Sequence, residues 1–237
     1  MINMTDIIQQ TIEWHEVKHA KIGGTLSKGL FTKGDDLFFK ILSERIEPFD
    51  PDEIEDFFEN KAMQRGNDLE PLGLEYLEEY TGLKFNSTGW LQSEENELIG
   101  ISPDGITEDL KILAEIKCPG AKKHTETIYN NCIPNDNLNQ VLHSFIANKN
   151  QEKHYFISFR PESPKHFIKE TTLDSIIDLG LKKTIEVEVI GKKGKPIKPK
   201  KMQVPDLKTV KEWRDIGINK ADELLKRIKE AEKNIEF

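Results

Sequence analysis

Short apolar runs in the middle of the chain predict a β-sheet. The segments 83–93, 98–102, 112–116 and 153–160 match the strand pattern, and turn residues separate them. In the segment 153–160, Tyr155, Ile157 and Phe159 fall on one face, as a period of two residues requires. We expect 166–173 to pair with this strand across the turn at 161–164, and 98–102 to form a hairpin with 112–116.

Apolar positions spaced three and four residues apart predict the helices. They cover 5–17 with Thr5 as the N-cap, and then 35–46, 52–80, 121–129, 135–149 and 206–235. We expect Gly66 to divide the third helix, which places Glu70 near the start of its second piece. In the segment 135–149, Gln140 and His143 fall off the apolar stripe.

Two further strands, 185–190 and 197–204, flank the sequence GKKGK and predict a lysine-tipped hairpin. Strands that alternate with helices indicate an α/β fold with a mixed central β-sheet flanked by helices. A chain of 237 residues is long enough for one generous domain. We therefore expect a single domain, 1–237, with a core at about 10–175 and a C-terminal basic hairpin and closing helix at 176–237.

Composition and charge narrow the class of protein. The sequence has no apolar run of 18 residues and begins without a signal stretch, so we expect a soluble cytoplasmic protein with no membrane association. Its two cysteines fit a reducing compartment. The net charge is −8, but the segment 182–211 carries ten lysines against three acidic residues, which permits a local basic surface.

The stretch ISPDGITEDLKILAEIKC carries the densest candidate chemistry. Because side chains alternate along a strand, Glu115 and Lys117 point to one face and Ile116 to the other. The predicted hairpin brings Asp104 beside Glu115. Two carboxylates about 4 Å apart repel by roughly 4 kcal/mol at an effective dielectric of 20, so we expect a cation between them. Oxygen ligands favour Mg²⁺ or Mn²⁺.

Each of these signals also has a plainer interpretation. Glu115 and Lys117 can form a strand-end salt bridge while Asp104 caps a turn. The turn KIGGT, followed by a further hydroxyl and flanked by lysines, is either an anion site or a solvated connection. By itself, Glu70 fits a first-turn glutamate stabilised by the helix dipole, and Gln140 fits a solvated amide.

The order of short motifs along the chain is more specific than any one of them. WHEVKHAKIGGT, RGNDLE, ISPDG, AEIKCPG, NLNQVLH and YFISFRP follow one another within about residues 10–175. This order resembles the phage-type alkaline exonucleases, the lambda exonuclease and YqaJ-like viral recombinase family within the PD-(D/E)xK nuclease superfamily. The resemblance implies a PD-(D/E)xK restriction-endonuclease-like core.

The resemblance also implies roles for individual residues of the core. Asp104 and Glu115 match the metal-binding acids, and Lys117 matches the catalytic lysine. Ile116 matches the residue whose backbone carbonyl completes the metal shell. Glu70 matches a helix glutamate that supports the site through metal or water.

Four more residues match positions that contact the DNA. Gln140 matches a glutamine near the scissile phosphate, and Lys18, Thr25 and Ser102 match a pocket for the terminal 5′-phosphate. Lys18 stands where the family has an arginine, and Thr25 stands where it has a serine. Lysine lacks the bidentate fork of arginine, so we expect a weaker preference for 5′-phosphate than in relatives.

The implied activity is a Mg²⁺-dependent 5′-to-3′ exonuclease, for which Mn²⁺ can substitute. It would digest one strand of linear double-stranded DNA to mononucleotides and leave a 3′ overhang for single-strand annealing recombination. The implied partners are double-stranded DNA ends, a single-strand annealing protein and further copies of the chain in a ring-shaped homotrimer. The implied location is the bacterial cytoplasm, for a phage or prophage protein.

Rival classes share parts of this pattern. A restriction-type or structure-specific PD-(D/E)xK endonuclease would keep Asp104, Glu115 and Lys117 but would cut closed circular DNA. A RecB-like nuclease with an iron–sulfur cluster needs four suitably spaced cysteines, and the chain has two. A non-enzymatic DNA-binding module is disfavoured by the intact acids and lysine.

Overall fold

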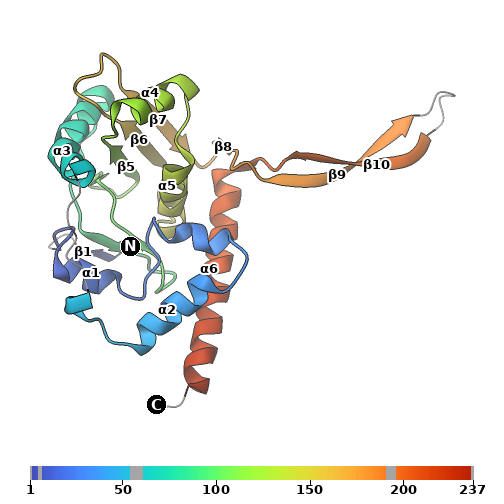
Figure 1. Cartoon of the computed structure of the whole chain (residues 1–237), viewed down its shortest axis with the longest axis horizontal. Coiled ribbons are helices and arrows are strands. Elements are labelled where there is room, and N and C mark those ends of the chain that lie inside the picture. The colour runs from blue at the N-terminus through green and yellow to red at the C-terminus, as the bar shows by residue number, and fades with distance from the viewer. Residues whose placement is uncertain (1, 5–6, 54–60, 191–195, 236–237) are drawn as a thin grey trace.

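A four-stranded mixed sheet forms the centre of the fold. The computed structural model describes residues 2–4, 7–53, 61–190 and 196–235. The sheet has the order β4-β5-β6-β7, with β4 at Gly105–Ile106, β5 at Ile112–Lys117, β6 at Lys153–Ser158 and β7 at Phe167–Thr172. β5 and β6 are parallel, and the other two pairings are antiparallel. This arrangement confirms the predicted mixed sheet and the pairing of β6 with β7 (Figure 1).

A second sheet contains three antiparallel strands, β1 (Ile2–Met4), β2 (Trp90–Gln92) and β3 (Gly100–Ile101). The predicted hairpin between 98–102 and 112–116 is therefore wrong, because β3 pairs with β2 while the short β4 pairs with β5. The chain changes sheets between β3 and β4. Apolar periodicity marks a strand correctly but does not specify its partner.

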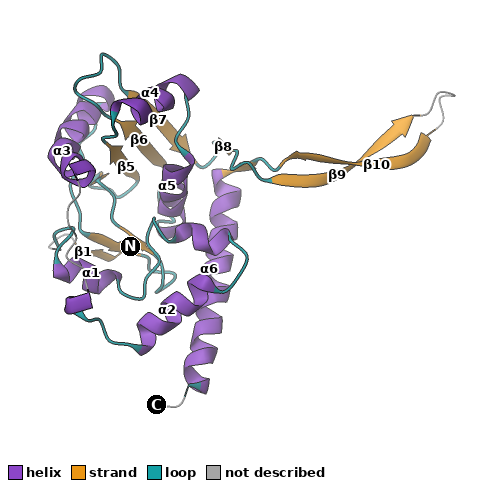
Figure 2. Ribbon diagram, in the orientation of Figure 1, coloured by secondary structure: helices purple, strands orange, loops and turns teal. Residues whose placement is uncertain are grey.

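Helices cover both faces of the central sheet (Figure 2). α3 (Lys61–Thr81) packs on the face that holds Ile116, and α5 (Asn135–Ala147) packs on the opposite face, which holds Phe156. The other helices are α1 (Ile12–Lys18), α2 (Asp36–Ile46), α4 (Ala121–Asn130) and α6 (Val210–Asn234), with 3₁₀ helices at Ser27–Phe31 and Pro51–Glu53.

The first helix is shorter than the sequence pattern predicts. α1 begins at Ile12, and its N-cap is Thr11, whose hydroxyl accepts the N–H of Trp14 at 3.3 Å. The predicted N-cap, Thr5, lies outside the described residues. The helix start at 5 is wrong because residues 9–11 form a turn, and Gln10 has a positive φ of 68°.

α3 is continuous where the sequence predicts a break. It runs through both Gly66 and Pro71, so the division at Gly66 is wrong. Packing outweighs the effect of these two helix breakers. Leu77 is fully buried, and the backbone at Gly73 lies close to Ile116. A Cβ on Gly73 would be 2.6 Å from Cγ2 of Ile116. The earlier part of the predicted helix, at 54–60, lies outside the described residues.

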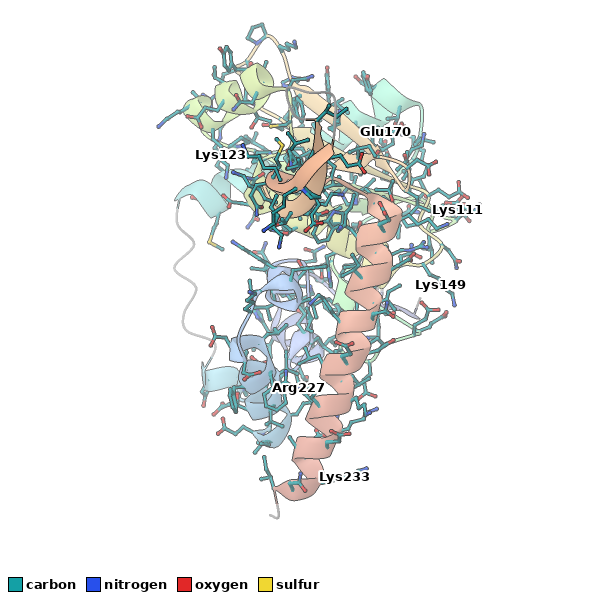
Figure 3. All side chains as sticks on the ribbon, turned by 90° about the vertical axis from the view of Figure 1, so that its right-hand side faces the viewer. Lys111, Lys123, Lys149, Glu170, Arg227 and Lys233 are labelled. Atoms are coloured by element: carbon teal, nitrogen blue, oxygen red, sulfur yellow. The ribbon has the colours of Figure 1, made fainter. Side chains whose placement is uncertain are left out.

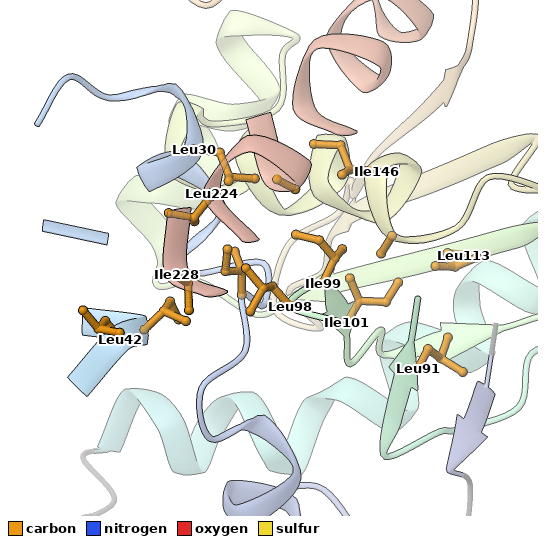
Figure 4. Packing of buried hydrophobic residues seen from close by; sticks show 14 of the residues in the cluster. Leu30, Leu42, Leu91, Leu98, Ile99, Ile101, Leu113, Ile146, Leu224 and Ile228 are labelled. Carbon is orange, nitrogen blue, oxygen red and sulfur yellow. The ribbon is translucent and has the colours of Figure 1, made fainter. Parts of the chain in front are cut away.

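α6 contributes to the largest hydrophobic cluster (Figure 4). Its N-cap Thr209 accepts the N–H of Glu212 at 3.1 Å, and the Glu212 carboxylate accepts the N–H of Thr209 at 2.7 Å, which completes a capping box. Leu224 and Ile228 then pack in the cluster that holds Ile99. The closing helix is therefore part of the core. No helix in the described part of the chain is long and apolar enough to cross a membrane.

A two-stranded ribbon projects from the body of the molecule (Figure 1). β9 (Lys182–Ile190) pairs antiparallel with β10 (Pro196–Pro205), which confirms the predicted hairpin. The short strands β8 (Ile176–Ile177) and β11 (Lys208–Thr209) pair at its base. Residues 191–195, between β9 and β10, lie outside the described residues.

Candidate active site

The end of β5 carries the central candidate residues. Ile116 is buried in the cluster under α3, so Glu115 and Lys117 point to the opposite side, as strand alternation predicts. The Lys117 ammonium forms an ion pair with Oε1 of Glu115 and lies 4.0 Å from Oδ2 of Asp104. The structure therefore brings together the two carboxylates and the lysine. A strand-end salt bridge accounts for the first pair but not for Asp104, whose side chain is only 10% exposed.

Asp104 enters this cluster from the turn before β4. Its backbone N–H donates to the carbonyl of Ala114 at 3.1 Å, and its Oδ2 accepts the N–H of Ile116 at 2.5 Å. Burial raises the pKa of Asp104 well above its ordinary value, and the charge of Glu115 adds to this shift. Burial opposes a charge on Lys117, but the two carboxylates outweigh burial and raise its pKa. Lys117 is therefore held as an ammonium.

Glu70 approaches the same cluster from α3. Burial raises the pKa of Glu70, the charge of Lys117 opposes this shift, and the charge of Glu115 adds to it. These mutual effects place Glu70 within electrostatic reach of both groups. Glu70 lies inside an uninterrupted helix that begins at Lys61, so its expected position near a helix start is wrong. The helix dipole does not explain this glutamate.

The charge of the cluster suits a divalent cation. A bound cation would favour the ionised forms of the three carboxyl groups of Glu70, Asp104 and Glu115, and with protonated Lys117 the cluster would then carry two negative charges. Among the residues that the structure describes, no three His, Cys, Asp or Glu side chains form a metal-binding group by themselves. An ion would therefore be held by Asp104 and Glu115, with main-chain and water oxygens completing the shell. Mg²⁺ fits this donor set, because it prefers oxygen ligands and keeps several waters.

Lys18 and Ser102 are joined through Trp14. The Nζ of Lys18 lies 3.2 Å from the centroid of the Trp14 ring, a cation–π contact. The indole Nε1 donates to Oγ of Ser102 at 2.8 Å, and Ser102 donates to the carbonyl of Gly89 at 2.6 Å. Burial lowers the pKa of Lys18 to about 8. The sequence did not predict this linking role of Trp14, although the residue opens the first motif.

A buried histidine anchors the glycine turn to β3. The Nε2 of His143 lies 3.0 Å from the carbonyl oxygens of both Ile22 and Gly100, so its N–H donates to this pair. His143 is fully buried, and burial lowers its pKa to about 4, which keeps the ring neutral. Its position off the apolar stripe of α5 therefore marks a polar anchor inside the protein.

The turn itself meets α5 at Gln140. A Cβ on Gly24 would lie 3.2 Å from Cγ of Gln140, so glycine allows this close approach. Thr25 follows in the turn and is exposed. The turn leads into the 3₁₀ helix Ser27–Phe31 rather than an α-helix, so the helix-dipole part of the predicted anion site does not apply.

One cleft of about 1210 Å³ collects the predicted site. Its lining includes Lys18, Thr25, Glu70, Ser102, Asp104, Glu115, Ile116, Lys117 and Gln140. The acid and lysine cluster and the predicted phosphate pocket therefore open into the same cleft. Gln140 faces this space and is not a remote solvated amide.

His154 is a lining residue that the sequence interpretation missed. Its Nδ1 lies 2.8 Å from Oγ of Ser144, and its Nε2 has no hydrogen-bond partner. Burial lowers the pKa of His154 to about 3, and the charge of Lys117 adds to this shift. The alternation of side chains along β6 places His154 on the same face as Phe156. The two-residue period of this strand could therefore have identified His154 from the sequence.

The family model of the YqaJ-like viral recombinase domain matches residues 13–150, more than half of the chain. The chain belongs to this family. A search of curated proteins finds no match.

Solved structures agree with the YqaJ-like assignment at the level of the fold. The alkaline exonuclease LHK-Exo from Laribacter hongkongensis is 20% identical, with a TM-score of 0.62 over 94% of this chain and 97% of that chain. A second structure of LHK-Exo, in complex with dAMP, gives the same values. The predicted PD-(D/E)xK-type α/β fold is confirmed.

Proposed function

We propose that this chain is a Mg²⁺-dependent exonuclease, for which Mn²⁺ substitutes. It digests one strand of linear double-stranded DNA from the 5′ end to mononucleotides and leaves a 3′ overhang. One observation carries the proposal: the cluster of Asp104, Glu115 and Lys117 shares a cleft with Lys18 and Ser102. A hydrolytic centre beside a cationic pocket suits an enzyme that holds a DNA end while it cuts. The YqaJ-like family membership supports a nuclease.

The side chains of the cluster have distinct proposed roles. Asp104 and Glu115 would hold the metal, with the carbonyl of Ile116 as a further ligand, and Glu70 would support it directly or through water. When bound, Mg²⁺ lowers the pKa of a water and polarises the phosphodiester. Lys117, held as an ammonium, orients the attacking water and stabilises the charge that develops on the phosphate. Gln140 contacts the scissile phosphate from α5.

The pocket determines how digestion proceeds. Lys18, Thr25 and Ser102 bind the 5′-phosphate that each cut exposes, so every hydrolysis prepares the next substrate. The 3′ overhang then serves a single-strand annealing protein. We place this reaction in the bacterial cytoplasm, for a phage or prophage protein. A ring-shaped homotrimer around the duplex would retain an acidic chain on DNA without a strongly basic surface.

Lys18→Ala is expected to narrow the rate difference between 5′-phosphorylated and 5′-hydroxyl ends by roughly tenfold, because it removes the cation of the pocket. The wild-type preference, measured as a ratio of kcat/KM, should also fall from pH 7 to pH 9. The pKa of Lys18 is lowered to about 8, so the free enzyme loses this charge as the pH rises through that value.

The matched control is Lys28→Ala, which removes an exposed lysine near the same turn but outside the cleft lining. This variant should keep the wild-type ratio and its pH dependence. An unchanged ratio in Lys18→Ala would remove Lys18 from the pocket.

The deciding experiment compares linear with closed circular duplex DNA, each strand labelled at its 5′ end, in Mg²⁺ and in EDTA. In Mg²⁺ we expect the linear duplex to yield mononucleotides, and the labelled 5′ nucleotide to be released before the 3′ half of the same strand is digested. In EDTA we expect no product. Cleavage of the closed circle would instead establish an endonuclease, the alternative that shares the same core. Duplex ends that are bound but left uncut in Mg²⁺ would contradict both.

A further inference from the structure

The two faces of the β9–β10 ribbon differ in polarity. Cross-strand partners share a face, so the pairing of Ile185 with Met202 and of Thr184 with Gln203 sorts the side chains. One face, called here the apolar face, carries Ile185, Val187, Val189, Met202 and Val204, together with Lys183 and Lys200. The other face is mostly polar and carries Lys182, Thr184, Glu186, Glu188, Lys201 and Gln203, together with Pro205 and the exposed Ile190.

The apolar face is not covered by the rest of the chain that the structure describes. Ile185 is 37% exposed and Met202 is 47% exposed. Figure 3, in which the ribbon points toward the viewer, shows it standing in front of the body rather than packed along α6. An isolated two-stranded hairpin is at best marginally stable in water. Exposed apolar side chains gathered on one face of such an element are typical of an interaction site.

The charge of the ribbon indicates what covers it. Residues 182–205 hold eight lysines and two glutamates, a net charge of +6, so the rest of this −8 chain carries −14. The body of a second copy therefore attracts the ribbon and also offers protein surface to bury its apolar side chains. Duplex DNA also carries negative charge, but its bases are stacked inside the helix. The valines of the apolar face would therefore contact charged phosphates. The apolar face thus favours a protein partner.

The free edge of β10 is poorly suited to strand addition. Pro199 and Pro205 lack N–H donors, and the register shifts between Ile197 and Lys200. Strands of nine and ten residues reach roughly 30 Å at about 3.3 Å per residue. The ribbon is therefore long enough to lie across a neighbouring molecule.

We propose that the apolar face of the β9–β10 ribbon docks on the acidic body of a second copy of this chain, so that the ribbon is the arm that holds the assembly together. An arm that meets a different surface of its neighbour makes a head-to-tail contact, which closes into a ring when the rotation permits. The proposal supplies the contact for the homotrimer of the proposed function, and it does not require nuclease activity.

The test compares two double variants at adjacent cross-strand pairs. Ile185→Lys with Met202→Lys places two charges on the apolar face, and Thr184→Lys with Gln203→Lys places two charges on the opposite face. Both variants add the same charge, and in both the two new lysines are direct cross-strand partners. Molar mass is measured by light scattering and native mass spectrometry over a concentration series. Neither pair contributes to the core clusters, so we expect both variants to fold, and circular dichroism verifies this.

We expect the wild-type chain to be oligomeric and the Ile185→Lys, Met202→Lys variant to associate roughly 100-fold more weakly. The Thr184→Lys, Gln203→Lys variant should keep an association constant within a few-fold of wild type. A monomeric wild-type chain, equal effects of the two variants, or an apolar-face variant that assembles normally would each overturn the proposal. Digestion of linear duplex by the same samples is scored separately, so a failure of the nuclease proposal is distinguished from a failure of the arm.

Discussion

Asp104→Asn is expected to digest linear duplex DNA roughly 1,000-fold more slowly than the wild-type chain in Mg²⁺. The substitution keeps the shape of the side chain and an oxygen that can accept the N–H of Ile116, but it removes one of the two charges that would hold the metal. The measurement is single-turnover release of mononucleotides from an end-labelled linear duplex.

Stability provides an independent readout for the same variant. Burial and the charge of Glu115 disfavour the ionised form of Asp104, so the neutral amide should leave the melting temperature in EDTA unchanged or raise it. Mg²⁺ should raise the melting temperature of the wild-type chain but not that of the variant. Asp109→Asn is the matched control, because it alters an acid in the next turn that bonds Thr107 and lies outside the cleft. A wild-type rate of digestion by Asp104→Asn would contradict the proposed metal site at Asp104 and Glu115.

Lys117→Met is expected to lower the same single-turnover rate roughly 100-fold while binding to duplex ends changes only a few-fold. Methionine keeps most of the apolar stem and removes the ammonium, which the charges of Glu115 and Asp104 hold in place despite burial. Lys122→Met is the control, because Lys122 lies on α4 with a side chain that is 91% exposed. A loss of end binding equal to the loss of rate would show that Lys117 acts in binding rather than in the chemical step.

Local geometry explains which features could be predicted from the sequence. The opposite orientations of Glu115 and Ile116 follow from the two-residue period of any strand, and the structure shows them. The proximity of Asp104 to Glu115 was predicted from a hairpin of β3 with β5 that does not exist. The two residues meet because β4, only two residues long, pairs with β5 immediately after Asp104. So short a strand has no periodic signal.

Features that depend on distant contacts could not be predicted in the same way. The continuity of α3 through Pro71 rests on its packing against β5, which lies about forty residues later in the chain. The burial of His143 rests on carbonyl groups of Ile22 and Gly100, which its own helix pattern does not contain. Motif order identified the residues of the cleft, but only the fold shows Trp14 joining Lys18 to Ser102.

The packing of α6 also bears on how a newly made chain acquires its shape. Ala221, Leu224 and Ile228 share a hydrophobic cluster with Ile22 and Ile99, so residues separated by about two hundred positions complete one interior. During synthesis the early segments leave the ribosome with these apolar side chains uncovered, and they must wait for the late helix before they are shielded from water. Complete shielding of this interior is therefore a late event in the making of the protein, because it requires α6.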